Sequence, residues 1–152
     1  MSPEAPAPAE PSPVFEQRRT VVAADIDALG HVNNLRYLEW VLAAAIDHSE
    51  AVGWSLARYQ ELGAAWVVRS HAIEYLRPAF VDDDLLVRTW VSEMTKVSSR
   101  RKTTVSRADG TTLARCETLW VFVSRRAHAL DRVPPELAAA FPLIPDAPPR
   151  VR

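Results

Sequence analysis

The hydrophobic and polar positions change rhythm twice along the chain. Residues 14–23 (VFEQRRTVVA) have a strand-like composition, and residues 33–51 then switch to a helical spacing. Within 33–51, charged residues fall on one narrow stripe at about 100° per residue, and apolar residues cover most of the remaining cylinder. We therefore expect a long helix that the rest of the chain largely encloses. The charged stripe consists of Arg36, Glu39, Asp47 and Glu50.

After this helix the chain returns to strand patterns. Residues 55–62 predict a short helix, and residues 134–141, with proline in the first turn, predict another. Asp109-Gly110 lies between two strand patterns and predicts a hairpin, in which both turn positions would need positive φ. The expected architecture is α+β, a curled antiparallel sheet wrapped around one long central helix. Segments rich in Val, Thr, Trp and Tyr predict its later strands at 65–76, 85–93, 99–107 and 111–124.

Both ends of the chain are expected to lie outside the folded domain. Residues 1–13 contain five prolines, which disfavour helix and strand alike, and residues 142–152 are similar. We expect a disordered leader at 1–13, a single domain at 14–141 and a flexible tail at 142–152. The leader does not resemble a signal peptide, and the sequence has no run of about 18 apolar residues that would indicate a membrane span.

Composition and charge narrow the class of protein. The 152 residues fit one domain, and 48% hydrophobic with 24% charged residues is ordinary for a soluble globular protein. The formal net charge of −1 argues against nucleic acid as a partner. Cys116 is the single cysteine and sits in a strand-like apolar context, so we expect a small core residue in a reduced, cytoplasmic protein.

Polar residues crowd the stretch DIDALGHVNNLRYLEW, from residue 25 to 40, just before the helix. Such a stretch can place a carboxylate, as nucleophile or general base, beside the hydrogen-bond donors that an oxyanion needs. If Asn33 is the N-cap, the N–H groups of Asn34 and its neighbours point outward with the positive end of the helix dipole. The sequence therefore predicts a catalytic loop at the start of the helix.

Two motifs in the chain follow a known pattern. They are Asp25-x-Asp27-x-x-Gly30-His31-Val32-Asn33-Asn34-x-x-Tyr37, and Tyr75-x-Arg77-Pro78 followed by Asp82 to Asp84 before a strand. With the order of the elements, these motifs resemble the hotdog fold, specifically the acyl-CoA thioesterases of the 4-hydroxybenzoyl-CoA thioesterase type. The similarity of pattern extends over residues 14–124.

The resemblance implies roles for residues of the loop. Asp27 matches the catalytic carboxylate, which attacks the thioester carbonyl or activates the water that does. The thioester oxygen would lie on the backbone amide of Asn34, and Gly30 would let the chain turn sharply near the acyl group. The loop is also similar to that of acyl-ACP thioesterases, whose histidine falls on His31 and whose asparagine falls on Leu29. We therefore expect His31 only to orient Asp27 or the substrate.

Other interpretations stay open at this point. Asp25 and Asp27 can both be turn residues that bond local backbone, which we favour for Asp25. A metal site is not expected, because no further His or Cys follows at ligand spacing. Other hotdog proteins act as dehydratases or hydratases, and a noncatalytic acyl-CoA-binding module would not need Asp27.

Coenzyme A, as part of the substrate, is the only cofactor that the resemblance implies, and its phosphates need cations. KVSSRRK supplies Lys96, Arg100, Arg101 and Lys102, although a solvated strand face explains this cluster equally well. Strand alternation would separate Arg101 from Arg100 and Lys102. The family also implies a homodimer or tetramer with the site at the subunit interface. Acyl chain length, an aromatic or aliphatic preference, and CoA or ACP as carrier do not follow from the sequence.

Overall fold

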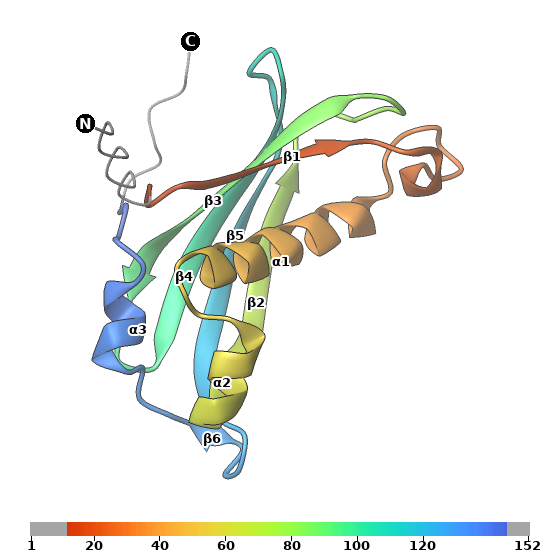
Figure 1. The fold of residues 1–152 in the computed structure, drawn as a ribbon. Helices are drawn as coiled ribbons and strands as arrows, with labels where there is room; N and C mark the ends of the chain where they lie inside the picture. The colour runs from red at the N-terminus through yellow and green to blue at the C-terminus, as the bar shows by residue number, and fades with distance from the viewer. Residues whose placement is uncertain (1–11, 146–152) are drawn as a thin grey trace, which may run out of the picture.

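The computed structural model describes residues 12–145, which form one antiparallel sheet with helices on one side (Figure 1). The strands are paired in the order β1-β3-β4-β5-β2, with β6 beside β5. The strands are β1 (Phe15–Thr20), β2 (Ala64–Tyr75), β3 (Asp84–Met94), β4 (Ser98–Arg107), β5 (Thr112–Ser124) and β6 (Ala129–Leu130). The helices are α1 (Asn34–Ala51), α2 (Leu56–Leu62) and α3 (Pro135–Ala139), with a short 3-10 turn at Ala23–Asp25.

Helix α1 crosses the concave face of the curled sheet and supplies the centre of the core (Figure 1). Its buried side chains include Tyr37, Trp40 and Ala44, which pack with Val87 of β3 and Val105 of β4. Val87 and Val105 are paired across the two strands, so both project toward the helix. The predicted α+β half-barrel around a long helix is confirmed.

The enclosure of α1 is incomplete within a single chain. Leu35 is 65% exposed and Ile46 is 59% exposed, and both lie on the side of α1 that faces away from the sheet. The sequence predicted exposure only along the charged stripe, whereas Leu35 and Ile46 beside that stripe are exposed as well. The second apolar side of α1 is thus left without a partner within residues 12–145.

The predicted hairpin between β4 and β5 forms, but its turn differs from the expectation. Gly110 has φ +90°, whereas Asp109 is not among the residues with positive φ. Gly110 N–H donates to the Arg107 carbonyl at 2.9 Å, and Arg107 N–H donates to the Thr111 carbonyl at 2.9 Å. The connection is therefore a turn followed by a left-handed glycine, as in longer hairpin loops, and only the glycine needs positive φ.

A second core cluster closes the other end of the sheet beneath α2 and α3. The chain continues to pack after α3, since Ile144 N–H donates to the Val91 carbonyl of β3 at 3.0 Å. The packed part of the chain therefore extends beyond residue 141, the predicted end of the domain. Residues 1–11, which make up most of the predicted leader, lie outside the described residues, as do residues 146–152. In the range 12–145, no helix is long and apolar enough to cross a membrane. The second core cluster, beneath α2 and α3, contains Trp54, Tyr59, Ala64, Val91, Phe122, Val133, Leu137 and Phe141.

Candidate active site

The loop before α1 is a small, tightly bonded hairpin. Asn33 N–H donates to the Asp25 carbonyl at 2.8 Å, and Asp27 N–H donates to the His31 carbonyl at 3.0 Å. Between these pairs, Ile26 and Val32 form an isolated antiparallel bridge. Paired backbones of this kind hold a loop in a single geometry, so the polar residues of the loop are fixed relative to the start of the helix.

Alternation along this hairpin separates an apolar side from a polar side. Val32 is buried, and Ile26 packs against the same core cluster. Because neighbouring residues in a strand point to opposite sides, Asp27 and His31 project away from that core. Their side chains are 26% and 32% exposed, so they are partly sheltered and still open to solvent. The loop thus presents a carboxylate and an imidazole at the surface on a rigid base.

The two aspartates of the loop have different environments. Asp25 accepts a hydrogen bond from Val22 N–H at 3.0 Å and lies 3.5 Å from Arg36 Nε, so its carboxylate holds the loop to the helix. Asp27 Oδ1 accepts from Leu29 N–H at 2.9 Å, and Oδ2 has no hydrogen-bond partner in the described chain. Asp25 therefore has a structural role, as predicted, and Asp27 keeps an oxygen available for chemistry.

His31 stands beside Asp27 without a hydrogen bond to it. Its Nδ1 lies 4.0 Å from Asp27 Oδ1 and 3.4 Å from the Val32 carbonyl. The predicted orientation of Asp27 by His31 therefore does not operate through a direct bond in this geometry.

Gly30 occupies the turn with φ +84°. A Cβ built on Gly30 would meet nothing within 4 Å, so the described chain leaves space for a side chain there. Glycine is favoured at this position by its positive φ, which other L-residues adopt only at a cost in free energy.

The first turn of α1 has the predicted cap. Asn33 is the N-cap, and its side-chain oxygen accepts from Leu35 N–H at 2.9 Å. Arg36 N–H donates to the Asn33 carbonyl at 2.9 Å. Asn34 N–H has no acceptor in the part of the chain that the structure describes, and Asn34 is exposed. The helix therefore offers one uncommitted donor at its positive end, one residue after the loop.

The structure brings the two sequence motifs together. Tyr75, at the end of β2, donates its hydroxyl to the Asn34 carbonyl at 3.0 Å. Val32 N–H donates to the carbonyl of Ala79, which lies in the segment between β2 and β3, at 2.9 Å. The Tyr75 contact links residues 41 apart and was not predicted, although Tyr75 belongs to the motif that carried the resemblance.

The predicted phosphate-binding cluster is divided by the sheet. Arg100 and Lys102 lie on the outer face, as alternation predicts, and Arg100 is paired with Glu93 and Glu117. Arg101 is only 6% exposed on the inner face, so it is not at the surface with them. Lys96 is exposed in the turn between β3 and β4. The Asp27 loop lies near the opposite end of β3, whose 11 residues at about 3.3 Å each span roughly 35 Å.

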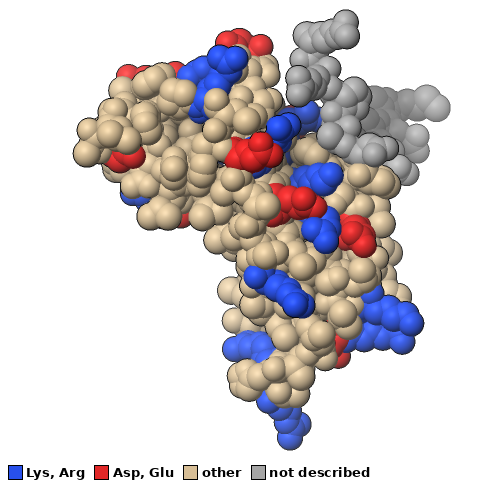
Figure 2. All heavy atoms as spheres, turned by 180° about the vertical axis from the view of Figure 1, so that it is seen from behind, with Lys and Arg blue, Asp and Glu red and all other residues tan. Residues whose placement is uncertain are grey.

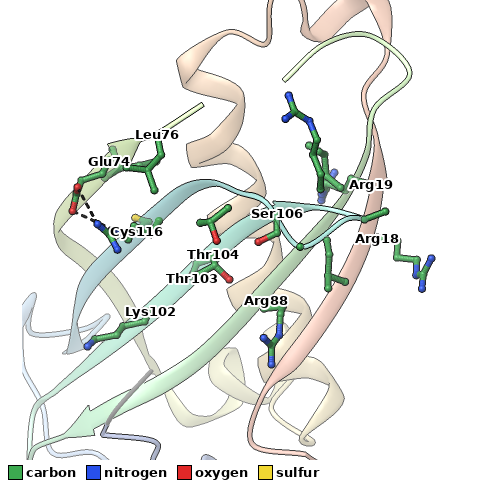
Figure 3. A pocket seen from close by; sticks show the side chains of 18 of the residues that line it. Arg18, Arg19, Glu74, Leu76, Arg88, Lys102, Thr103, Thr104, Ser106 and Cys116 are labelled. Carbon is green, nitrogen blue, oxygen red and sulfur yellow. Dashed lines mark hydrogen bonds and ion pairs between the residues drawn. The ribbon is translucent and has the colours of Figure 1, made fainter. Parts of the chain in front are cut away.

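The outer face of the sheet carries an open groove with a volume of about 1040 Å³. Arg18, Arg88 and Lys102 project along it from β1, β3 and β4, and Glu74 pairs with Arg115 at its side (Figure 3). Figure 2 shows basic side chains interspersed with acidic ones and with broad uncharged areas on the opposite side of the molecule from Figure 1. Arg18 and Arg88 were not predicted as partners of Lys102, because they come from other strands.

The remaining candidates occupy structural positions. Cys116 is buried, as expected, and burial raises the pKa of its thiol. Its sulfur lies 3.9 Å from His71 Nδ1, which bonds Thr118 Oγ1 at 2.8 Å. Among residues 12–145 no group of three or more His, Cys, Asp or Glu side chains could hold a metal ion.

Comparisons with known proteins agree with this architecture. A family model described as "Thioesterase-like superfamily" matches residues 21–141. No protein with a curated description matches the sequence. A putative oleoyl thioesterase from Lactobacillus plantarum has a TM-score of 0.81 and 23% identity, with 91% of this chain covered. This chain spans only 55% of that protein.

Two further solved structures are similar along nearly their whole length. A 1,4-dihydroxy-2-naphthoyl-CoA thioesterase from Synechocystis has a TM-score of 0.77 and 23% identity, with 84% of this chain and 95% of that chain covered. A 4-hydroxybenzoyl CoA thioesterase mutant, complexed with 4-hydroxybenzoyl CoA, has a TM-score of 0.77 and 20% identity, with 86% and 100% covered. These likenesses confirm the expected hotdog fold.

Proposed function

Since the chain belongs to the thioesterase-like superfamily, we propose that it hydrolyses an acyl-CoA thioester to the free acid and CoA. The observation that carries this proposal is that, within the described residues, both an oxygen of Asp27 and the Asn34 N–H at the start of α1 have no hydrogen-bond partner. Both groups belong to one rigid hairpin-and-helix unit. A carboxylate and a preorganised donor are what attack on a thioester carbonyl requires.

In the proposed reaction the thioester oxygen accepts a hydrogen bond from Asn34 N–H, which stabilises the negative charge that develops on it. The Asp27 carboxylate acts in one of two ways. It attacks the carbonyl carbon and expels CoA as thiolate, leaving an anhydride that water hydrolyses, or it takes a proton from the water that attacks. Either way the C–S bond breaks, the thiolate takes up a proton, and the acyl carbon gains an oxygen from water.

A second copy of the chain completes the proposed site. β2 is a 12-residue edge strand that pairs only with β5 within the described residues, and such edges invite pairing. We propose that two copies join through the β2 edges and the open side of α1. The distance of Lys96 from its own Asp27 loop favours a role for Lys96 and Arg100 toward the substrate held by the other copy. Lys102 with Arg18 and Arg88 is the stronger candidate for phosphate contacts, and Arg101 is withdrawn from that role.

Thiol release from a panel of acyl-CoAs, aliphatic and aromatic, tests the proposed function. Asp27→Ala is expected to lower kcat by about 10²–10⁴-fold, the range for loss of a general base or nucleophile. Asp25→Ala is the matched control, because it removes a neighbouring carboxylate with a structural role. We expect it to lower stability and to leave turnover within about tenfold of the wild type.

Other outcomes would reject the proposal. Tight binding of acyl-CoA with no thiol release would identify a noncatalytic binding module. Water addition to or loss from an enoyl or β-hydroxyacyl thioester, with the thioester intact, would identify a hydratase or dehydratase. Equal loss of thiol release in both aspartate variants would remove Asp27 from its proposed role.

A further inference from the structure

His48 lies at the other end of α1 from the catalytic loop, in an aromatic enclosure. It is 2% exposed, stacks on Phe15 with ring centroids 5.4 Å apart, and meets the edge of Phe141 at 5.1 Å. Fourteen residues separate it from Asn34, which at 1.5 Å per residue is about 21 Å along the helix. His48 is therefore remote from the proposed thioester site.

Arg101 determines the tautomer of His48. Arg101 Nη1 lies 2.8 Å from His48 Nδ1, and a guanidinium can only donate, so Nδ1 accepts and Nε2 carries the proton. Burial and the charge of Arg101 lower the pKa of His48 to about 3, which keeps the ring neutral. The Nε2–H is buried and has no acceptor among the described residues. A buried hydrogen-bond donor without an acceptor costs free energy, so an acceptor for this N–H is expected.

The charge of Arg101 is likewise uncompensated. Its described polar contacts are His48 and the Thr89 hydroxyl at 3.2 Å, both neutral, and its guanidinium lies 5.5 Å from the centre of the Phe141 ring. Within residues 12–145 no carboxylate lies within 4.0 Å of it. A buried cation is normally paired with an anion, because removing it from water costs several kcal/mol. Arg101 therefore has the positive charge for one anion and no anionic partner among the described residues.

A depression of about 530 Å³ lies beside this pair. This volume falls within the range of small-molecule sites. His48 lines it, with mostly apolar neighbours from the start of β1 and the end of α1, and Arg88 adds a second cation whose Nε lies 3.0 Å from Glu16 Oε1. The other apolar lining residues are Val14, Phe15, Ala51 and Val52.

We propose that this depression, which is lined by His48 and lies beside the buried Arg101 that bonds His48, is a second binding site, which takes a carboxylate carried on an apolar chain. His48 Nε2 is covered in this structure, so binding includes a side-chain shift that lets the carboxylate accept the Nε2–H. The carboxylate then offsets the charge of Arg101, and the chain lies against the apolar lining. The site does not depend on thioester hydrolysis. A free fatty acid, whether a product of this enzyme or of another reaction, has the required chemistry.

Titration calorimetry with decanoate, in the absence of any thioester, tests this site. Ala51→Trp fills the mouth of the depression from an exposed position, and Glu50→Trp, one residue earlier and outside the lining, is its matched control. His48→Phe keeps the aromatic stacking and removes the donor. We expect decanoate to bind the wild type and Glu50→Trp equally. His48→Phe should bind it at least about tenfold more weakly, as expected for a lost hydrogen bond to a charged group, and Ala51→Trp should not bind it.

Decanol is the uncharged comparison ligand and should bind at least about tenfold more weakly than decanoate. Absence of decanoate binding to the wild type would overturn the proposal, as would equal binding by Ala51→Trp and Glu50→Trp. If decanol bound as tightly as decanoate, the pair would not recognise a carboxylate and the assignment would fail. Asp27→Ala should retain the decanoate site, so loss of hydrolysis and loss of this site are separate results.

Discussion

At the residue scale, the proposed chemistry depends on what each carboxylate is already bonded to. Asp25 is held by Val22 N–H and faces Arg36, whereas Asp27 accepts one backbone hydrogen bond and has one oxygen without a partner in the described part of the chain. Two residues of the same type, two positions apart, thus have different bonding, and only Asp27 is proposed to act in catalysis. The pattern DID alone could not assign these roles, but the bonding of each side chain supports the assignment made from the family motif.

Residue-scale pairs that are distant in sequence were beyond prediction. The cap at Asn33 and the glycine turn at Gly30 depend on their immediate neighbours, so the sequence was sufficient for them. His48 and Arg101 are 53 residues apart, and the sequence analysis considered Arg101 only as part of a cluster of cations for phosphate. Their burial follows from the curvature of the sheet over the end of α1.

The buried His48 predicts a dependence of stability on pH. Its pKa is about 3 in the folded protein and 6.5 is the ordinary value, so below pH 6.5 the unfolded chain binds a proton that the folded chain does not. The free energy of unfolding should therefore fall as the pH is lowered from 6.5, by up to about 1.4 kcal/mol per unit. Between pH 6.5 and 5 the wild type should lose about 2 kcal/mol more than His48→Phe does, measured by urea unfolding.

His128→Asn serves as the control for this measurement. His128 is exposed and has φ +51°, a conformation that asparagine tolerates. Its variant should follow the wild-type pH dependence. Parallel curves for the wild type and His48→Phe would show that His48 takes up its proton equally in both states, contrary to its buried, neutral assignment.

At the element scale, the start of α1 is held between the loop and the end of β2. Tyr75→Phe removes the hydroxyl that bonds the Asn34 carbonyl. Loss of one neutral hydrogen bond should lower kcat by about threefold to tenfold with little change in KM, since Tyr75 positions the donor without binding CoA. Amide hydrogen exchange in the first turn of α1 should accelerate. Unchanged exchange and unchanged kcat would separate Tyr75 from the site.

The elements themselves were largely predictable, because each has a local pattern. The expected strands and helices are present, with shifts at their ends such as β1 at Phe15–Thr20 in place of 14–23. The errors concern what surrounds an element. The apolar residues around most of α1 predicted a largely enclosed helix, yet Leu35 and Ile46 beside the charged stripe are left exposed by a single chain. The turn at Asp109-Gly110 adopted a longer hairpin geometry.

At the scale of the whole molecule, the exposed side of α1 predicts assembly. Ile46 is 59% exposed on this helix, and Ile46→Glu places a charge where the second copy is proposed to pack. Burial of an unpaired charge is strongly unfavourable, so we expect the dimer dissociation constant to rise by at least about tenfold. Sedimentation velocity over a range of concentrations measures it. Glu136→Lys, on an exposed position of α3 away from both the β2 edge and the open side of α1, is the control and should leave the dimer intact.

A wild-type protein that is monomeric at all concentrations, and still active, would contradict the shared site. Activity that falls together with the dimer fraction in Ile46→Glu would support it. If Ile46→Glu remained dimeric with normal activity, the open side of α1 would not be the interface.

The most direct test of the central claim is Asn34→Pro compared with Asn34→Ala. Proline is favoured at the first position of a helix, and Asn33, with φ −60° and ψ 133°, already has the conformation required before proline. The substitution therefore deletes the Asn34 N–H while keeping the helix. We predict that Asn34→Pro lowers kcat for acyl-CoA hydrolysis by about 10²–10³-fold with an unchanged melting temperature, and that Asn34→Ala stays near wild type. Equal turnover by the two folded variants would contradict the proposed oxyanion site.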